Sequence, residues 1–266
     1  MCIRDSLRKA SHLFPSLRCI CIPYGVDPIL GAASYCNSPF RIVYSGRLAE
    51  EQKRILKVVS TMIGICKKFP EVECSILGEG ESRDRITQMI IDEGFELRIA
   101  LKGRLTKDEV ARELKNSQAL LLLSDYEGLP LAVLEAMAAG VVPIARKIES
   151  GIPEIVRTGK TGYLVGDDPD EVNHAVGEMI GNPDRWQYLS RAARELIRDS
   201  YSGETSHLQW EKVIEEIARK PDLAPLDLKA KEMTFQPINK LLFQYDYRTP
   251  PMIKRVYRRL RRAFIT

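Results

Sequence analysis

The sequence predicts an α/β fold in which helices cover both faces of an open parallel sheet. Two observations lead to this prediction. From residue 41 to about residue 220, short apolar runs alternate with longer segments whose apolar residues recur three or four positions apart. Within this region, Ala119–Leu123 is apolar throughout, which is typical of a central strand in a parallel sheet. Strands and helices that alternate in this way form right-handed βαβ units.

Each element has its own signal in the sequence. The predicted strands are short apolar runs that end at turn residues, and the predicted helices show apolar residues at helical spacing. Thr106 is expected to cap the third helix, and Pro130 and Gly140 bound the fourth. The strands are expected, in chain order, at 42–45, 73–77, 97–101, 119–123, 141–145 and 162–165. The helices are expected, in chain order, at 53–69, around 86–90, and at 106–115, 131–139, 169–180, 183–199 and 203–219.

Composition divides the chain into three regions. Residues 1–40 are interrupted by prolines and glycines, and we expect them to be an irregular linker or the remnant of a preceding domain. Residues 41–220 are expected to form one Rossmann-like domain, and residues 221–266 a C-terminal extension. The 266 residues are 44% hydrophobic, which is sufficient for a substantial core and excludes a wholly disordered chain.

The sequence supports neither membrane insertion nor secretion. It contains no apolar run of about 18 residues, the length that a membrane-spanning helix requires. The N-terminal residues lack the apolar core and small-residue cleavage site of a secretory signal. The six cysteines form no CxxC pair, so we expect free thiols in a reducing compartment. The expected location is therefore cytoplasmic.

Basic residues are concentrated near the C-terminal end. Seven cations and no acid lie between Arg248 and Arg262, so the net charge of +4 leaves the rest of the chain at −3. Apolar residues at helical spacing, with arginines on the other side, predict a short basic amphipathic helix at 252–264. Such a helix is suited to an anionic membrane surface; docking onto another domain and a frayed end are the alternatives. Nucleic acid is not expected as a partner, because the body of the chain carries no basic groove with interleaved aromatic residues.

We expect no metal centre and no other cofactor. The six cysteines and three histidines form no cluster with metal-ligand spacing. Asp168-Pro169-Asp170 spells a DxD motif, but its position at a helix start predicts a capping role.

Loops that follow the strands are where open parallel sheets bind ligands. After the first strand, Gly46 permits a sharp turn, and Arg47 and Lys53 flank the start of the following helix. Cations at this position oppose the helix dipole, and a bound diphosphate would reverse that cost, because arginine and lysine both bind its oxygens. The alternative is a solvated surface in which Glu50 and Glu51 balance the charge.

The loop after the second strand only partly matches a dinucleotide-binding loop. In Gly78-Glu79-Gly80-Glu81-Ser82-Arg83, an arginine takes the place of the third glycine of GxGxxG. The next predicted strand also lacks a terminal acidic residue that could bind a ribose. A nicotinamide dehydrogenase is therefore not supported, and a tight turn is the expected role of this loop.

Two acidic residues, Glu127 and Glu135, lie eight positions apart in the loop after the fourth strand and in the helix behind it. Glu135 interrupts an otherwise apolar helix, where a carboxylate needs hydrogen-bond donors such as sugar or ribose hydroxyls. Glu127 lies just ahead of the helix N-terminus, where free backbone N–H groups can bind phosphate oxygens. About two helical turns separate the residues, so both can contact one extended ligand. The alternative is that Glu127 is a helix-start charge and Glu135 a surface residue.

Five motifs, in order along the chain, resemble the retaining glycosyltransferases of family 4, which have the two-domain GT-B fold. Residues Glu127–Glu135 are similar to the E-x7-E motif of that family. The other similar segments are Arg41–Leu48 with Gln52-Lys53, Ile76–Gly80, Glu135–Gly140, and Gly151–Val156 with Gly159–Val165. The resemblance covers roughly residues 22–220. One departure is Ser150, which stands where the family often has a glycine.

The resemblance implies a role for each candidate residue. Arg47 and Lys53 would clamp the donor diphosphate, and Glu127 would contact the donor sugar, which makes these three the candidate catalytic residues. Glu135 would bind the nucleotide ribose, and backbone N–H groups after Glu127 would bind phosphate oxygens. The implied donor-binding residues are Gly46, Gly128, Leu129, Leu131 and Glu135.

The resemblance also implies a reaction and a missing partner. A glycosyl group would pass from a nucleotide-diphosphate sugar, with UDP expected over GDP, to an acceptor with retention and without a metal. Family members bind the acceptor in an N-terminal domain, and Cys19–Asp27 looks like the linker that follows it. We therefore expect a donor-binding half-enzyme that is inactive by itself. The alternative is a non-catalytic module that binds a nucleotide sugar or serves as a membrane adaptor.

Overall fold

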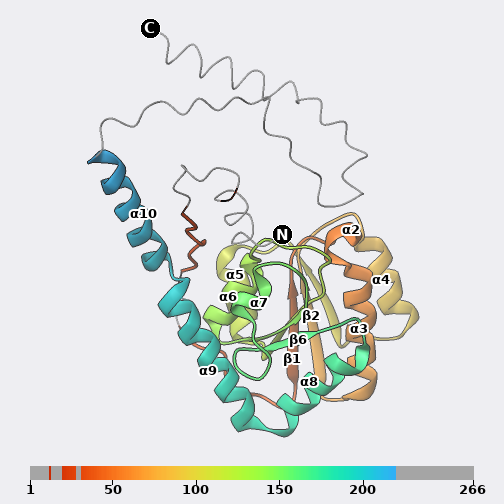
Figure 1. Ribbon diagram of the computed structural model, residues 1–266. Helices are drawn as coiled ribbons and strands as arrows, with labels where there is room; N and C mark the ends of the chain where they lie inside the picture. Colours follow the sequence, from red (N-terminus) through yellow and green to blue (C-terminus); the bar gives the residue numbers. More distant parts are fainter. Residues whose placement is uncertain (1–11, 13–19, 28–30, 220–266) are drawn as a thin grey trace, which may run out of the picture. The chain divides into compact units, whose positions relative to one another are not determined.

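The structure, a computed structural model, describes residues 12, 20–27 and 31–219 (Figure 1). The chain divides into two units, Met1–Pro221 and Asp222–Thr266, and every described residue belongs to the first. The predicted basic helix at 252–264 lies outside the described residues, as does part of the predicted linker at 1–40.

One parallel sheet organises the part of the chain that the structure describes. Its strands lie in the order β3-β2-β1-β4-β5-β6, and every neighbouring pair is parallel. The strands are β1 (Phe40–Ser45), β2 (Val72–Leu77), β3 (Ile99–Gly103), β4 (Ala119–Leu122), β5 (Val142–Arg146) and β6 (Tyr163–Val165). The predicted open parallel sheet is confirmed. Because the strand order reverses between β1 and β4, the switch point of the sheet lies between them.

Helices cover both faces of this sheet, as predicted (Figure 1). On one face α3 contacts α4 and α8, and on the other α6 contacts α5 and α9. None of the described helices is both long and apolar enough to cross a membrane. The helices are α2 (Glu50–Lys53), α3 (Ile55–Lys68), α4 (Arg83–Asp92), α5 (Lys107–Lys115), α6 (Leu131–Ala139), α7 (Ile152–Ile155), α8 (Pro169–Gly181), α9 (Pro183–Ser200) and α10 (Gly203–Ala218).

The two strands at the switch point are buried in the core. Every residue of β4 is at most 1% exposed, which confirms the predicted central apolar strand. Ile42 and Val43 of β1, which pair with Ala119 and Leu120 of β4, are completely buried. Burying each such aliphatic side chain contributes about 1.5–3 kcal/mol, so the loops that follow β1 and β4 rise from a rigid base.

Two predicted helix starts are confirmed by their capping bonds. The Thr106 hydroxyl accepts a hydrogen bond from the backbone N–H of Glu109, whose carboxylate accepts the Thr106 N–H at 2.8 Å. Asp168 caps α8 by accepting a hydrogen bond from the Asp170 N–H at 2.9 Å. The DxD motif therefore serves as a helix cap, as its position predicted.

The third strand begins two residues later than predicted, at Ile99. The Arg98 guanidinium donates to carbonyl oxygens of Cys66, Phe69 and Val72, which anchors it against the connection from α3 to β2. Leu97 is 98% exposed and contributes nothing to the core. The apolar character of Leu97 therefore gave a false strand start.

The first predicted helix is also interrupted. Residues 50–53 form the short helix α2, and α3 begins only at Ile55, because Arg54 between them has a φ of 49° and a ψ of 46°. This left-handed conformation ends one helix and starts the next. The four-residue helices α2 and α7 were not predicted, since neither is long enough to show an apolar period.

Candidate functional site

The loops after β1 and β4 meet above the switch point of the sheet. Lys53, the last residue of α2, donates a hydrogen bond from its ammonium group to Oε1 of Glu127 at 2.5 Å. The two side chains are only 14% and 8% exposed. A pair shielded in this way interacts more strongly than a surface ion pair. The structure thus brings together two of the three candidate catalytic residues.

Arg47 reaches the same place through Gln52. The Arg47 guanidinium donates to the side-chain oxygen of Gln52 at 2.7 Å, and the Gln52 amide donates to the carbonyl of Tyr126 at 3.1 Å. The Asp125 N–H donates in turn to the Gln52 carbonyl at 2.9 Å. Gln52 therefore joins the loops after β1 and β4, a role that the sequence analysis did not assign to it.

A buried tyrosine supports the arginine loop from below. The hydroxyl of Tyr44, which is fully buried in β1, donates to the Arg47 carbonyl at 2.7 Å. Burial, together with the nearby Glu127 carboxylate, raises the pKa of Tyr44 above its usual value, so the hydroxyl stays neutral and remains a donor. Sequence reasoning missed this residue, although a tyrosine in an otherwise aliphatic strand is a signal for a buried hydroxyl.

The glycines of the first two loops are required by close packing. A Cβ atom on Gly46 would lie 3.0 Å from the Tyr44 hydroxyl. A Cβ atom on Gly78 would lie 1.9 Å from the Gly46 carbonyl oxygen, and one on Gly80 would lie 2.5 Å from the Leu48 carbonyl oxygen. The loop after β2 therefore lies directly against the loop after β1, and its glycines serve backbone packing.

Backbone N–H groups are available at the start of α6. No side chain caps this helix, and the Val133 N–H donates to the Pro130 carbonyl at 3.1 Å. Among the described residues, the N–H groups of Leu131 and Ala132 have no hydrogen-bond partner, so these two are free for a ligand. A Cβ atom on Gly128 would have no heavy atom within 4 Å, which indicates open space beside the loop. Leu129 packs against the core. A Cβ atom on Gly151 would lie 2.7 Å from the Gly128 carbonyl oxygen and 3.0 Å from Cδ1 of Leu129, so this loop restricts position 151 to glycine.

Glu135 lies one to two turns farther along α6. It is partly buried, and this burial raises its carboxyl pKa, an effect that the nearby Lys107 of α5 partly opposes. Lys107 was not predicted as a site residue. Among the described residues, Glu135 is not part of the hydrogen-bonded group that contains Lys53 and Glu127.

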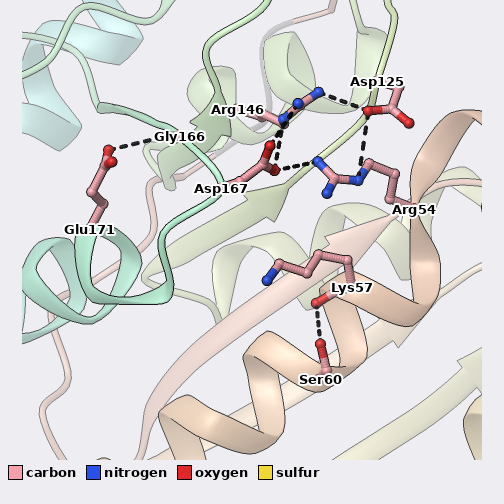
Figure 2. Close-up of polar contacts among 8 residues, drawn as sticks. All are labelled: Arg54, Lys57, Ser60, Asp125, Arg146, Gly166, Asp167 and Glu171. Carbon is pink, nitrogen blue, oxygen red and sulfur yellow. Dashed lines mark hydrogen bonds and ion pairs between the residues drawn. The ribbon is translucent and has the colours of Figure 1, made fainter.

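Four charged residues, Arg54, Asp125, Arg146 and Asp167, form a network (Figure 2). The Arg54 guanidinium lies 2.6 Å from Asp167 and 3.7 Å from Asp125. Arg146 binds the same two carboxylates at 2.9 and 2.8 Å. Hydrogen bonds from Arg146 and Arg54 lower the pKa of Asp167 to about 2. The sequence did not predict this network, because its members come from four separate segments.

No group of three or more potential metal ligands occurs among the described residues. The chemistry at the switch point is instead that of paired charges, free helix-start N–H groups and one further buried carboxylate. Such an arrangement can bind an elongated ligand that carries both anionic and hydroxyl groups.

The fold defines the class of the protein: it is the fold of the Rossmann-like domain of GT-B glycosyltransferases. Staphylococcus aureus TarM, solved in complex with fondaparinux, α-GlcNAc-glycerol and UDP, matches with a TM-score of 0.68 at 24% identity, over 78% of this chain and 42% of that chain. The pneumococcal O-GlcNAc transferase GtfA, solved with UDP and GlcNAc, matches with a TM-score of 0.64 at 20% identity, over 82% and 44%. At these identities the likeness establishes the fold.

The chain belongs to the family described as "Glycosyl transferases group 1", whose sequence profile matches residues 37–196. Among its relatives, the N-acetyl-alpha-D-glucosaminyl L-malate synthase of Bacillus anthracis is 30% identical over 171 residues. That match includes 63% of this chain and 44% of the relative. The matched part of the chain thus spans less than half the length of the relative.

Proposed function

We propose that this chain is the donor-binding domain of a retaining glycosyltransferase of family 4, and that its ligand is a UDP-sugar. The contact between Lys53 and Glu127 at the switch point carries this proposal. It places a cation and a carboxylate next to each other where a doubly wound sheet binds ligands. The presence of UDP in the solved complexes of TarM and GtfA supports UDP as the nucleotide.

The donor diphosphate would bind between the loops after β1 and β4. Lys53 supplies a shielded positive charge, and Arg47, oriented by Gln52, supplies a second one. The start of α6 adds backbone N–H groups near Gly128, Leu129 and Leu131, and the positive end of the helix dipole. These groups would stabilise the negative charge that develops on the departing diphosphate.

The two carboxylates would bind opposite parts of the donor. Glu127, held by Lys53, would accept hydrogen bonds from the donor sugar. Glu135 would accept hydrogen bonds from the ribose hydroxyls. These bonds would compensate for the lost hydration that raises the pKa of its carboxyl group in the free protein. The donor would thereby be fixed at both ends.

Transfer of the sugar also requires an acceptor site, which this domain would not supply. We propose that a separate N-terminal domain supplies the acceptor site and that transfer occurs with retention and without a metal. We further propose a cytoplasmic protein whose residues 252–264 contact an anionic membrane surface. A non-catalytic module that binds nucleotide sugars remains the second candidate function.

Calorimetric titration with UDP and UMP tests the donor site. UDP should bind more tightly than UMP, because only UDP carries the second phosphate that Arg47 and Lys53 would bind. Equal affinities would contradict the proposed diphosphate site. Adding a separately produced N-terminal half, and assaying transfer from a UDP-sugar, then separates the enzyme from the non-catalytic module. NMR of the product's anomeric proton tests retention.

A further inference from the structure

Arg54 is the only non-glycine residue with a positive φ among the residues that the structure describes. It lies between Lys53, which ends α2, and Ile55, which begins α3. Residues with a Cβ atom avoid this left-handed conformation, and glycine adopts it without strain. A residue with a long charged side chain at such a point indicates that the side chain has a function that glycine could not provide.

The contacts of Arg54 explain what holds it in this conformation. Its side chain is 20% exposed and binds Asp167 and Asp125, and Arg146 binds the same two carboxylates from the other side (Figure 2). The two guanidinium groups and the two carboxylates balance in charge. The network therefore offers no net positive charge to an added anion, and its contacts are those among its own four members.

The α2–α3 junction and the loop after β4 contact each other in this network, and they do so again where Lys53 binds Glu127. Arg54 directly follows Lys53, and Asp125 comes two residues before Glu127. The Asp125 N–H also donates to the carbonyl of Gln52 on α2. A shift of the α2–α3 junction relative to the loop after β4 would therefore break the network and separate Lys53 from Glu127 together.

We propose that Arg54 is a positioning residue: by binding Asp125 and Asp167 from a left-handed backbone, it holds the Lys53 ammonium against the Glu127 carboxylate. The position of Lys53 follows from the contacts of the free protein. Only the consequence for nucleotide binding rests on the function proposed above.

Double-mutant cycles without ligand test this proposal. The coupling between Lys53→Met and Glu127→Gln, measured by urea unfolding, is compared in the natural background and in the Arg54→Gly background. We expect the coupling to be present in the first and lost in the second. Arg54→Gly also relieves backbone strain. The free energy of unfolding should therefore fall by much less than the coupling energy between Lys53 and Glu127 does. Equal coupling in the two backgrounds would overturn the proposal.

Two further variants make the cycles decisive. Should Arg54→Gly fail to fold, Asp167→Asn removes the shortest contact of Arg54 without changing its backbone, and it should cause the same loss of coupling. Lys67→Ala is the matched control, because it breaks an ion pair with Glu93 at the other end of α3. It should leave the coupling unchanged, and an equal loss there would show a general effect of removing charge from α3.

Titration with UDP separates this inference from the proposed function. UDP affinity should fall roughly tenfold in Arg54→Gly. If the coupling is lost in Arg54→Gly but the natural chain binds no nucleotide, positioning by Arg54 stands and the proposed function fails. If the natural chain and Arg54→Gly bind UDP equally and the coupling persists, the proposed function survives and the positioning role is wrong.

Discussion

Lys53 and Glu127, 74 positions apart in the sequence, join an ammonium group and a carboxylate at 2.5 Å above the switch point of the sheet. Each side chain is shielded from solvent, and each would be costly to bury without the other. The pair also occupies the two loops that a ligand at this point would contact.

Replacing Lys53 tests the proposed diphosphate contact. Lys53→Ala should weaken UDP binding by about 1.5–3 kcal/mol, the contribution of a charged hydrogen bond. It should weaken UMP binding much less. Calorimetry on the natural chain, Lys53→Ala and the surface control Lys67→Ala measures the effect. An unchanged UDP affinity in Lys53→Ala would count against the clamp.

Replacing Glu135 tests the proposed ribose contact. Glu135→Gln keeps the side-chain volume but removes the charged acceptor, so UDP should bind more weakly. The 2′,3′-dideoxy analogue of UDP, which lacks both ribose hydroxyls, should bind the natural chain and Glu135→Gln alike. An unaltered UDP titration for the variant would reject the role of Glu135 in ribose binding.

The pH dependence of stability reports on Glu135 in the free protein. Its pKa is raised by burial above the ordinary glutamate value of 4.5, so the folded state binds this proton more tightly than the unfolded state. Its contribution to stability is complete below about pH 4.5 and is lost as the pH rises through the folded-state pKa. Glu135→Gln should therefore be more stable than the natural chain at pH 7, and urea unfolding at pH 4 should show this advantage reduced.

Asp167 should show the opposite pH dependence. Hydrogen bonds from Arg146 and Arg54 lower its pKa to about 2, so its contribution is present above about pH 4 and lost as the pH falls towards 2. Asp167→Asn should be less stable than the natural chain at pH 7, by less than about 1 kcal/mol because the carboxylate is half exposed and screened. Unfolding curves between pH 7 and pH 2 should converge at the acidic end, and a constant difference would contradict this assignment.

Gly78 and Gly94 form a matched pair for the packing of the first two loops. Both have positive φ values, 135° at Gly78 and 72° at Gly94. At Gly78 a Cβ atom would lie 1.9 Å from the Gly46 carbonyl oxygen, whereas at Gly94 it would meet no heavy atom within 4 Å. Gly94→Ala should cost about 1–2 kcal/mol, from backbone strain alone. Gly78→Ala should cost clearly more in thermal or urea unfolding, and equal losses would show that the loops can separate.

The sequence was sufficient for those features that depend on local pattern. The apolar run at Ala119–Leu123 predicted the central strand, and Thr106 and Asp168 predicted helix starts that the capping bonds confirm. The left-handed Arg54 could not be predicted, because arginine favours helices and no neighbouring glycine or proline marks the break. The roles that we assign to Arg47, Lys53, Glu127 and Glu135 stay predictions.

Residues that act between distant segments were the ones that the sequence did not reveal. The hydroxyl of Tyr44 supports Arg47 only because the chain turns at Gly46, and the network of Arg54 and Asp167 joins residues 113 positions apart. Such contacts follow from the topology of the sheet. Local spacing carries no information about them.

Gln52 shows what kind of side chain can connect the loops after β1 and β4. It accepts a hydrogen bond from Arg47 and donates one to the Tyr126 carbonyl with a single amide group. A glutamate of the same length is only an acceptor when ionised, and a methionine lacks a strong donor and a strong acceptor alike. An uncharged amide is therefore the chemical requirement at this position, and through it a displacement of either loop is transmitted to the other.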